Sequence, residues 1–168
     1  MRIGIDIDDT LVSSSESFDK IIKKYDVDFK KKFKDRWTED EKKIIFKNYL
    51  KETLMDAKIK DDAKEVLDCI YDLGHELIII TARGNNHCED IEEFTIDFIK
   101  QQNLKISEFH FRENKKSDLA KRLNIDLMID DSDYVYNNMK QENIDCILFG
   151  DKIKTWKEVL EYIRDKEV

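Results

Sequence analysis

The first eleven residues constrain the fold most strongly, because they place carboxylates at the end of an apolar run. The run alternates small or acidic residues with three isoleucines, Ile3, Ile5 and Ile7. This β-branched alternation predicts a buried strand. Asp6, Asp8 and Asp9 crowd its carboxyl end, where burial and repulsion raise carboxyl pKa values unless a cation or hydrogen bonds hold the groups ionised. The stretch therefore predicts a divalent-cation site; the alternative is an acidic turn after an edge strand, with Asp9 and Thr10 capping the next segment.

Four later apolar runs predict the remaining strands of a sheet. They cover residues 77–80, 109–111, 127–129 and 146–149. Segments with apolar residues at helical spacing separate them. Strands that alternate with helices form a parallel sheet with helices on both faces. We therefore expect an α/β protein with a five-stranded parallel sheet flanked by helices.

An insertion separates the first strand from this regular alternation. It contains two stretches with helical spacing, at about 15–25 and 38–54, and the second opens with a capping box at Thr38 and Glu41. Neither stretch belongs to a strand–helix–strand repeat. We expect a core domain of residues 1–12 and 59–168 and a helical insertion of residues 13–58.

Polar side chains recur where the predicted strands end. They are Asp6 and Asp8, Thr81, Lys116 just before its helix, and Asp130 with Asp131. The carboxyl ends of parallel strands meet at one edge of a sheet, which is where ligands bind in open α/β proteins. Four separate polar groups at one edge indicate an active site more strongly than a chance set of polar loops.

Charge and composition exclude several other classes of protein. A formal net charge of −8 argues against a nucleic-acid polymer or an anionic membrane as the partner, since both need a basic surface. No apolar run approaches the roughly 18 residues of a membrane span, and the chain begins directly with a strand, so we expect neither a membrane anchor nor a signal peptide. The 3 cysteines lack zinc-site spacing. These features predict a cytoplasmic protein, and they leave its oligomeric state open.

Four motifs resemble those of the haloacid dehalogenase superfamily, in order and in spacing. They are Asp-Ile-Asp-Asp-Thr-Leu at 6–11, Ile-Ile-Ile-Thr at 78–81, a lysine near 116 that leads a helix, and Met-Ile-Asp-Asp at 128–131. Within the superfamily, the chain is most similar to the 5′-nucleotidase branch, which includes bacterial nucleotidases and deoxyribonucleotidases. The narrower likeness rests on residues 116–131 and on the tail Ile-Leu-Phe-Gly followed by Thr-Trp-Lys-Glu-Val. The resemblance implies a Rossmann-like core, a cap inserted after the first motif, and a phosphatase activity.

The chemistry of the first motif suits the hydrolysis of phosphate esters. A carboxylate that attacks phosphorus splits a slow reaction into two steps, and Asp6 is the candidate nucleophile. Asp8 could protonate the leaving oxygen and then take a proton from the attacking water, and the resemblance assigns the same two roles. Mg²⁺ prefers oxygen ligands, which Asp6, the Asp8 carbonyl and one or both of Asp130 and Asp131 would supply.

The remaining motif residues are candidates for binding the phosphoryl group. Thr81 would donate a hydrogen bond to it, within the stretch Thr81-Ala82-Arg83, and a lysine would hold nucleophile and phosphate together. Lys116 is preferred over Lys115 because it directly precedes Ser-Asp-Leu, as in the family. Arg83 is either a phosphate-binding arm or a surface charge.

The insertion is the candidate for substrate recognition. A basic stretch with interleaved aromatic residues, 29–37, would lie in the cap, where lysines attract anions and an aromatic ring could stack on a base. We expect the cap's apolar stripes to pack together, and these consist of Phe18, Ile21, Ile22, Tyr25, Ile44, Ile45, Leu50 and Leu54. This packing leaves Phe33, Trp37 or Tyr49 to face the substrate, with Trp37 preferred.

The sequence thus predicts a Mg²⁺-dependent phosphomonoesterase that acts through an aspartyl-phosphate, with nucleoside monophosphates as favoured substrates. One alternative is a phosphatase for a sugar phosphate or another small phosphorylated metabolite. The other is a catalytically idle fold kept as a binding module, which the intact motifs argue against.

Overall fold

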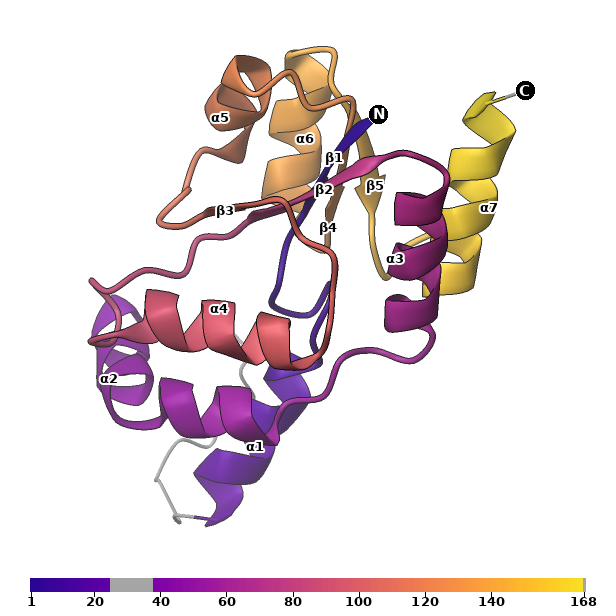
Figure 1. Cartoon of the computed structure of the whole chain (residues 1–168). Coiled ribbons are helices and arrows are strands. Elements are labelled where there is room, and N and C mark those ends of the chain that lie inside the picture. Colours follow the sequence, from indigo (N-terminus) through magenta and orange to yellow (C-terminus); the bar gives the residue numbers. More distant parts are fainter. Residues whose placement is uncertain (25–37, 168) are drawn as a thin grey trace.

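The computed structural model describes residues 1–24 and 38–167, and Figure 1 shows their arrangement. The strands are β1 (Arg2–Ile5), β2 (Glu76–Ile80), β3 (Glu108–His110), β4 (Leu127–Asp130) and β5 (Asp145–Leu148). The helices are α1 (Ser14–Lys24), α2 (Glu39–Asp56), α3 (Ala63–Asp72), α4 (Ile91–Gln101), α5 (Lys116–Arg122), α6 (Asp133–Gln141) and α7 (Trp156–Glu167). The strands form one parallel sheet in the order β3-β2-β1-β4-β5. The predicted five-stranded α/β fold is confirmed.

Helices cover both faces of the sheet, and each face has its own apolar core. Ile3 and Ile5 of β1 pack with α3 and α7, where Trp156 is fully buried. The opposite face packs against α5 and α6 through Leu119 and Met139. The three central strands, β2, β1 and β4, are therefore buried on both sides, as near-continuous apolar runs in a parallel sheet require.

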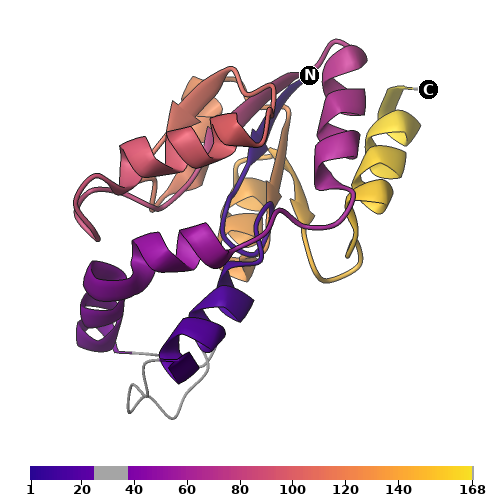
Figure 2. The ribbon, with the colours of Figure 1, turned by 60° about the horizontal axis from the view of Figure 1, so that its bottom comes forward.

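The insertion forms a helical layer at the carboxyl edge of the sheet. A third apolar cluster joins α1 and α2 to α4, and it consists of Phe18, Ile22, Ile45, Leu50, Leu54 and Ile91. Figure 2 shows α4 running alongside α2. Two chain segments connect the insertion to the core, and they lie side by side. Ser13 N donates to Lys58 O at 3.0 Å, and Lys60 N donates to Leu11 O at 2.9 Å. The division at residues 12 and 58 stays a prediction.

The structure corrects part of the predicted packing within this layer. The capping box at Thr38 and Glu41 opens α2 as predicted. Ile44, however, is 53% exposed, because α2 turns the neighbouring Ile45 and Phe46 inward instead. Tyr25, Phe33 and Trp37 lie outside the described residues. No helix in the described part of the chain is long and apolar enough to cross a membrane.

Candidate active site

The predicted site residues gather where the three central strands end. Ile5 of β1 lies opposite Ile129 of β4, and Asp6 N continues this pairing by donating to Ile129 O at 3.0 Å. Asp6 therefore lies beside Asp130, the last residue of β4. Thr81 directly follows β2, on the other side of β1, and is 1% exposed. The parallel register thus brings the first, second and fourth motifs to one edge.

Lys116 joins two of these motifs. Its Nζ lies 2.6 Å from Asp6 Oδ1 and 2.7 Å from Asp130 Oδ2, and its side chain is buried. Lys115 instead pairs with Asp118 at 3.1 Å on the surface. The first turn of α5 therefore brings Lys116, the residue preferred from the sequence, to the candidate nucleophile.

The electrostatics of this cluster depend on burial. Burial raises the pKa of Asp6 well above its usual range; the Lys116 ammonium opposes this, and the carboxylates of Asp130 and Asp8 add to it. Burial alone would lower the pKa of Lys116, but the two carboxylates outweigh it and raise that pKa. Lys116 is therefore charged, and the carboxylates together carry more charge than it offsets.

The excess negative charge fits a divalent cation. Asp6, Asp130 and Asp131 each offer an oxygen, and these oxygens lie within 4.8 Å of one another. The whole cluster holds four carboxylates and two basic side chains, namely Asp6, Asp8, Asp130, Asp131, Arg83 and Lys116. Within this named set, carboxylates outnumber basic side chains. An all-oxygen, acidic donor set is the kind that Mg²⁺ prefers.

Asp8 and Asp9 have different partners from Asp6. The Asp8 carboxylate turns toward Arg83, whose Nε and Nη2 donate to Oδ2 and Oδ1 at 2.7 and 2.5 Å. Burial would raise the pKa of Asp8, but the Arg83 charge and these hydrogen bonds outweigh it and hold that pKa below its ordinary value. Asp9 accepts from Ser15 N at 2.9 Å and so caps α1. The capping role considered for Asp9 is thus present alongside the carboxylate cluster.

Arg83 is not a surface charge. Its side chain is 4% exposed, so that interpretation is wrong. The loop that carries it is held at both ends, because Thr81 Oγ1 accepts from Arg83 N at 3.2 Å and Arg83 O accepts from Arg112 N at 2.7 Å. A Cβ at Gly84 would lie 2.3 Å from Arg112 Cγ, which explains the glycine at this close approach.

An apolar slot opens beside the Asp8–Arg83 pair, between the core and the insertion. Its volume is about 120 Å³, and it is lined by Asp8, Phe18, Phe46, Leu50, Ala82, Arg83 and His87. The Phe46 and His87 rings meet edge to face with centroids 5.4 Å apart. Ala82, a predicted substrate-binding residue, lines this slot, whereas Tyr49 packs against the apolar cluster of the insertion.

Sequence reasoning missed Phe46 and His87. One available signal was the spacing of Phe46 and Leu50, which lie one turn apart on α2 and share a face. No pattern in the sequence identified His87, which reaches the slot from the loop between β2 and α4.

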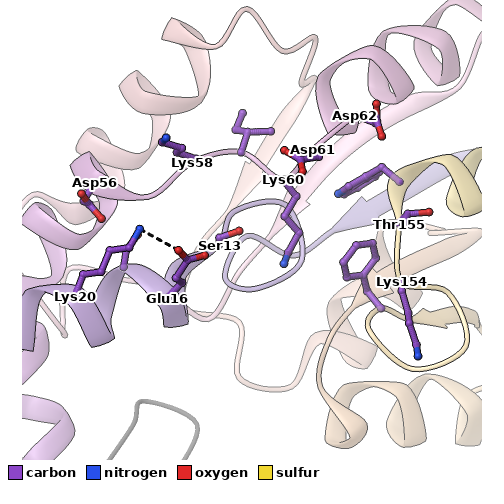
Figure 3. Close-up of a pocket in the computed structure, with 14 residues that line it drawn as sticks. Ser13, Glu16, Lys20, Asp56, Lys58, Lys60, Asp61, Asp62, Lys154 and Thr155 are labelled. Atoms are coloured by element: carbon purple, nitrogen blue, oxygen red, sulfur yellow. Dashed lines mark ion pairs between the residues drawn. The ribbon is translucent and has the colours of Figure 1, made fainter.

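A larger hollow of about 530 Å³ lies away from the cluster, where the insertion joins the core (Figure 3). Its charged lining residues are balanced in sign, namely Lys20, Lys58, Lys60, Lys154, Glu16, Asp56, Asp61 and Asp62. Lys20 and Glu16 pair with each other at 3.0 Å. None of the predicted site residues lines this hollow, whereas Asp8 and Arg83 line the smaller slot, so the slot is the candidate substrate site.

Known proteins resemble this chain over most of its length. No family model matches the chain. A protein of Oceanobacillus iheyensis named "Putative nucleotidase" is 27% identical in an alignment that covers 88% of this chain and 86% of that protein.

Solved structures resemble the whole chain. A haloacid dehalogenase-like hydrolase of Streptococcus pneumoniae has a TM-score of 0.67 at 15% identity, covering 96% of this chain and 97% of that one. A predicted phosphatase of Clostridium acetobutylicum has a TM-score of 0.68 at 15% identity, covering 98% of each chain. A haloacid dehalogenase family hydrolase of Deinococcus radiodurans with bound phosphate and sodium has a TM-score of 0.70 at 9% identity, covering 99% and 96%.

These likenesses confirm the haloacid dehalogenase fold expected from the four motifs. The structure from Clostridium acetobutylicum carries a phosphatase name, and the relative from Oceanobacillus iheyensis carries a nucleotidase name.

Proposed function

We propose that this protein is a cytoplasmic, Mg²⁺-dependent phosphomonoesterase whose favoured substrates are nucleoside monophosphates. The observation that carries the proposal is the buried Lys116 ammonium between Asp6 and Asp130, at the carboxyl ends of β1 and β4. A lysine there can hold a nucleophilic carboxylate and a phosphoryl oxygen together.

The first step transfers the phosphoryl group to the enzyme. The negative phosphomonoester, bound next to Asp8 and Arg83, raises the pKa of Asp8 from its lowered value, so that Asp8 takes up a proton when the substrate binds. An Asp6 oxygen attacks phosphorus, the bond from phosphorus to the leaving oxygen breaks, and Asp8 gives that oxygen its proton. Thr81, Arg83 and Lys116 bind the phosphoryl oxygens. The buried position of Asp6 limits access of bulk water to this step.

The second step returns the enzyme to its starting state. Water attacks phosphorus of the Asp6 aspartyl-phosphate and gives a proton to Asp8, and the bond from phosphorus to Asp6 breaks. Inorganic phosphate leaves, and Asp8 again carries the proton for the next leaving group. Asp6, the Asp8 carbonyl, and Asp130 with Asp131 would hold Mg²⁺, which offsets negative charge on the transferring group.

Nucleoside monophosphates are favoured over sugar phosphates for two reasons. The relative from Oceanobacillus iheyensis carries a nucleotidase name. Phe18, Phe46 and Leu50 line the slot beside Asp8. These apolar side chains suit a flat nucleobase better than a sugar that carries several hydroxyl groups.

A panel of phosphomonoesters tests the proposal. Phosphate release is measured with Mg²⁺ for nucleoside monophosphates, sugar phosphates and an aryl phosphate, using wild type, Asp6→Asn and the exposed control Asp61→Asn. We expect the highest kcat/KM for nucleotides, normal rates for Asp61→Asn and none for Asp6→Asn. Higher kcat/KM for sugar phosphates would favour that alternative, and no release from any compound would favour an idle binding module.

A further inference from the structure

Arg83 is the basic side chain of the site whose hydrogen bonds are incomplete. Nε and Nη2 are engaged by Asp8, whereas Nη1 is buried and has no hydrogen-bond partner among the described residues. A buried donor on a charged group is costly to leave unpaired, and such a donor in a folded protein calls for an explanation. The missing acceptor is accounted for if the substrate supplies it.

The guanidinium is also held too firmly to act as a mobile arm. Its backbone is fixed on one side by Thr81 and on the other by Arg112. Its side chain is almost fully buried, next to Ala82 and Phe46 in the wall of the slot. Arg83 therefore presents a fixed fork of donors.

The Asp8 carboxylate needs a partner that fixes its direction, and the Arg83 guanidinium provides one. Its side chain is 32% exposed, so packing alone does not fix the direction of its carboxylate. Two parallel hydrogen bonds from a planar guanidinium fix both the position and the plane of a carboxylate. A group that exchanges a proton with the leaving oxygen must lie within hydrogen-bond reach of that oxygen.

We propose that Arg83 is the positioning residue of Asp8, and that its Nη1 binds an oxygen of the bound phosphomonoester. One rigid guanidinium then fixes the direction of the Asp8 carboxyl group and positions the substrate next to it. The proposal rests on the proposed phosphatase function and goes beyond it, since it assigns Arg83 a role exerted through Asp8 in addition to binding phosphate.

The dependence of rate on the leaving group tests this role. Phenolate is a poorer leaving group than para-nitrophenolate, so phenyl phosphate relies more on proton donation by Asp8. We expect Arg83→Gln to lower kcat for phenyl phosphate by about 100-fold and for para-nitrophenyl phosphate by less than about 10-fold. The control Arg164→Gln, an exposed arginine on α7, keeps wild-type rates on both esters.

Two further variants separate positioning from simple charge. Arg83→Lys keeps the charge but not the fork, so we expect the same unequal loss on the two esters. Arg83→Gln added to Asp8→Asn should cost little beyond Asp8→Asn alone with phenyl phosphate, because the two residues act as a unit. Thermal unfolding of each variant checks that it folds, and Arg83→Lys serves if Arg83→Gln does not.

Two results would overturn the inference while leaving the phosphatase intact. One is an equal loss on both esters that appears in KM and is restored by Arg83→Lys, which would make Arg83 a phosphate-binding charge alone. The other is an additive loss in the double variant. Wild-type protein that releases phosphate from neither ester would instead remove the proposed function, and the positioning role with it.

Discussion

Lys116 Nζ lies 2.6 Å from Asp6 Oδ1, although 110 positions separate the two residues in the chain. The pair exists because α5 begins at Lys116 while β1 ends one residue before Asp6. Asp130 completes the arrangement from β4, at 2.7 Å from the same nitrogen. A single ammonium thus neutralises part of the charge of two buried carboxylates.

Replacing Lys116 by Gln should damage both activity and stability. The substitution leaves Asp6 and Asp130 buried without their cation, and breaking a buried pair in this way costs about 3 kcal/mol. Urea unfolding without metal measures the loss. Lys115→Gln is the matched control, since its side chain is 60% exposed and its effect should stay within about 0.5 kcal/mol. Equal, small effects of the two variants would contradict the buried ion pair.

Asp6→Asn should abolish turnover and stabilise the metal-free protein. The pKa of Asp6 is raised in the folded state, so the folded protein binds the carboxyl proton more tightly than the unfolded chain does. As the pH rises above the ordinary carboxyl pKa, Asp6 must ionise in the folded state, and this lowers the free energy of unfolding. The amide removes that cost. The unfolding temperature of Asp6→Asn should therefore exceed that of wild type at about pH 7, and the gain should shrink toward about pH 4. A gain in unfolding temperature that grows on acidification would contradict the raised pKa of Asp6.

Mg²⁺ should raise the unfolding temperature of the wild-type protein, because a ligand that binds the folded state stabilises it. At about 100 times its dissociation constant, the stabilisation is about 2.7 kcal/mol. Asp131→Asn should weaken this response by replacing a charged carboxylate donor with a neutral amide, whereas Asp61→Asn should not. Activity should be lost in EDTA and restored by Mg²⁺. Ca²⁺ should inhibit, because it accepts more ligands and could bind both Asp6 oxygens. Full activity after exhaustive chelation would exclude a metal requirement.

Phe46→Ala should lower kcat/KM for substrates that place a base in the slot. Stacking of a base on an aromatic side chain is worth about 1–3 kcal/mol, so kcat/KM for nucleotides should fall by about 10-fold or more. Acetyl phosphate, which has no ring, should be affected much less. Ile44→Ala is the control on the same helix, since Ile44 points to solvent. An equal loss on both substrates would mean that Phe46 supports only the packing of the insertion.

Trp37→Ala provides the competing prediction made from the sequence. The sequence favours Trp37 as the stacking residue, and this predicts that kcat/KM for nucleotides falls by about 10- to 100-fold. Comparison with Phe46→Ala under the same conditions decides between the two aromatic residues. A loss confined to Trp37→Ala would return the role to the basic stretch.

The features predicted correctly from the sequence are those written in local patterns. The apolar run at 77–80 became β2, and Thr38 with Glu41 opened α2, because strand burial and helix capping depend on neighbouring residues. Placing Lys116 and the aspartates at one edge required only the additional rule that parallel strands align.

The features that were missed depend on tertiary contacts. The partner of Arg83 is Asp8, 75 positions away, and the turn after β2 brings them together. The rotation of α2 that exposes Ile44 and buries Ile45 follows from packing against α1 and α4. Propensity and periodicity do not encode either contact, since both depend on the geometry of distant segments.

The central claim is that Asp6 carries the phosphoryl group during turnover. Wild-type protein is mixed with a substrate and Mg²⁺, quenched in acid within one turnover, digested and analysed by mass spectrometry. We predict one phosphoryl group on the peptide that contains Asp6, and none on that peptide from Asp6→Asn. Phosphate release at the wild-type rate with no phosphoryl group on that peptide would contradict the role of Asp6 as the nucleophile. Phosphate release by Asp6→Asn would contradict it as well.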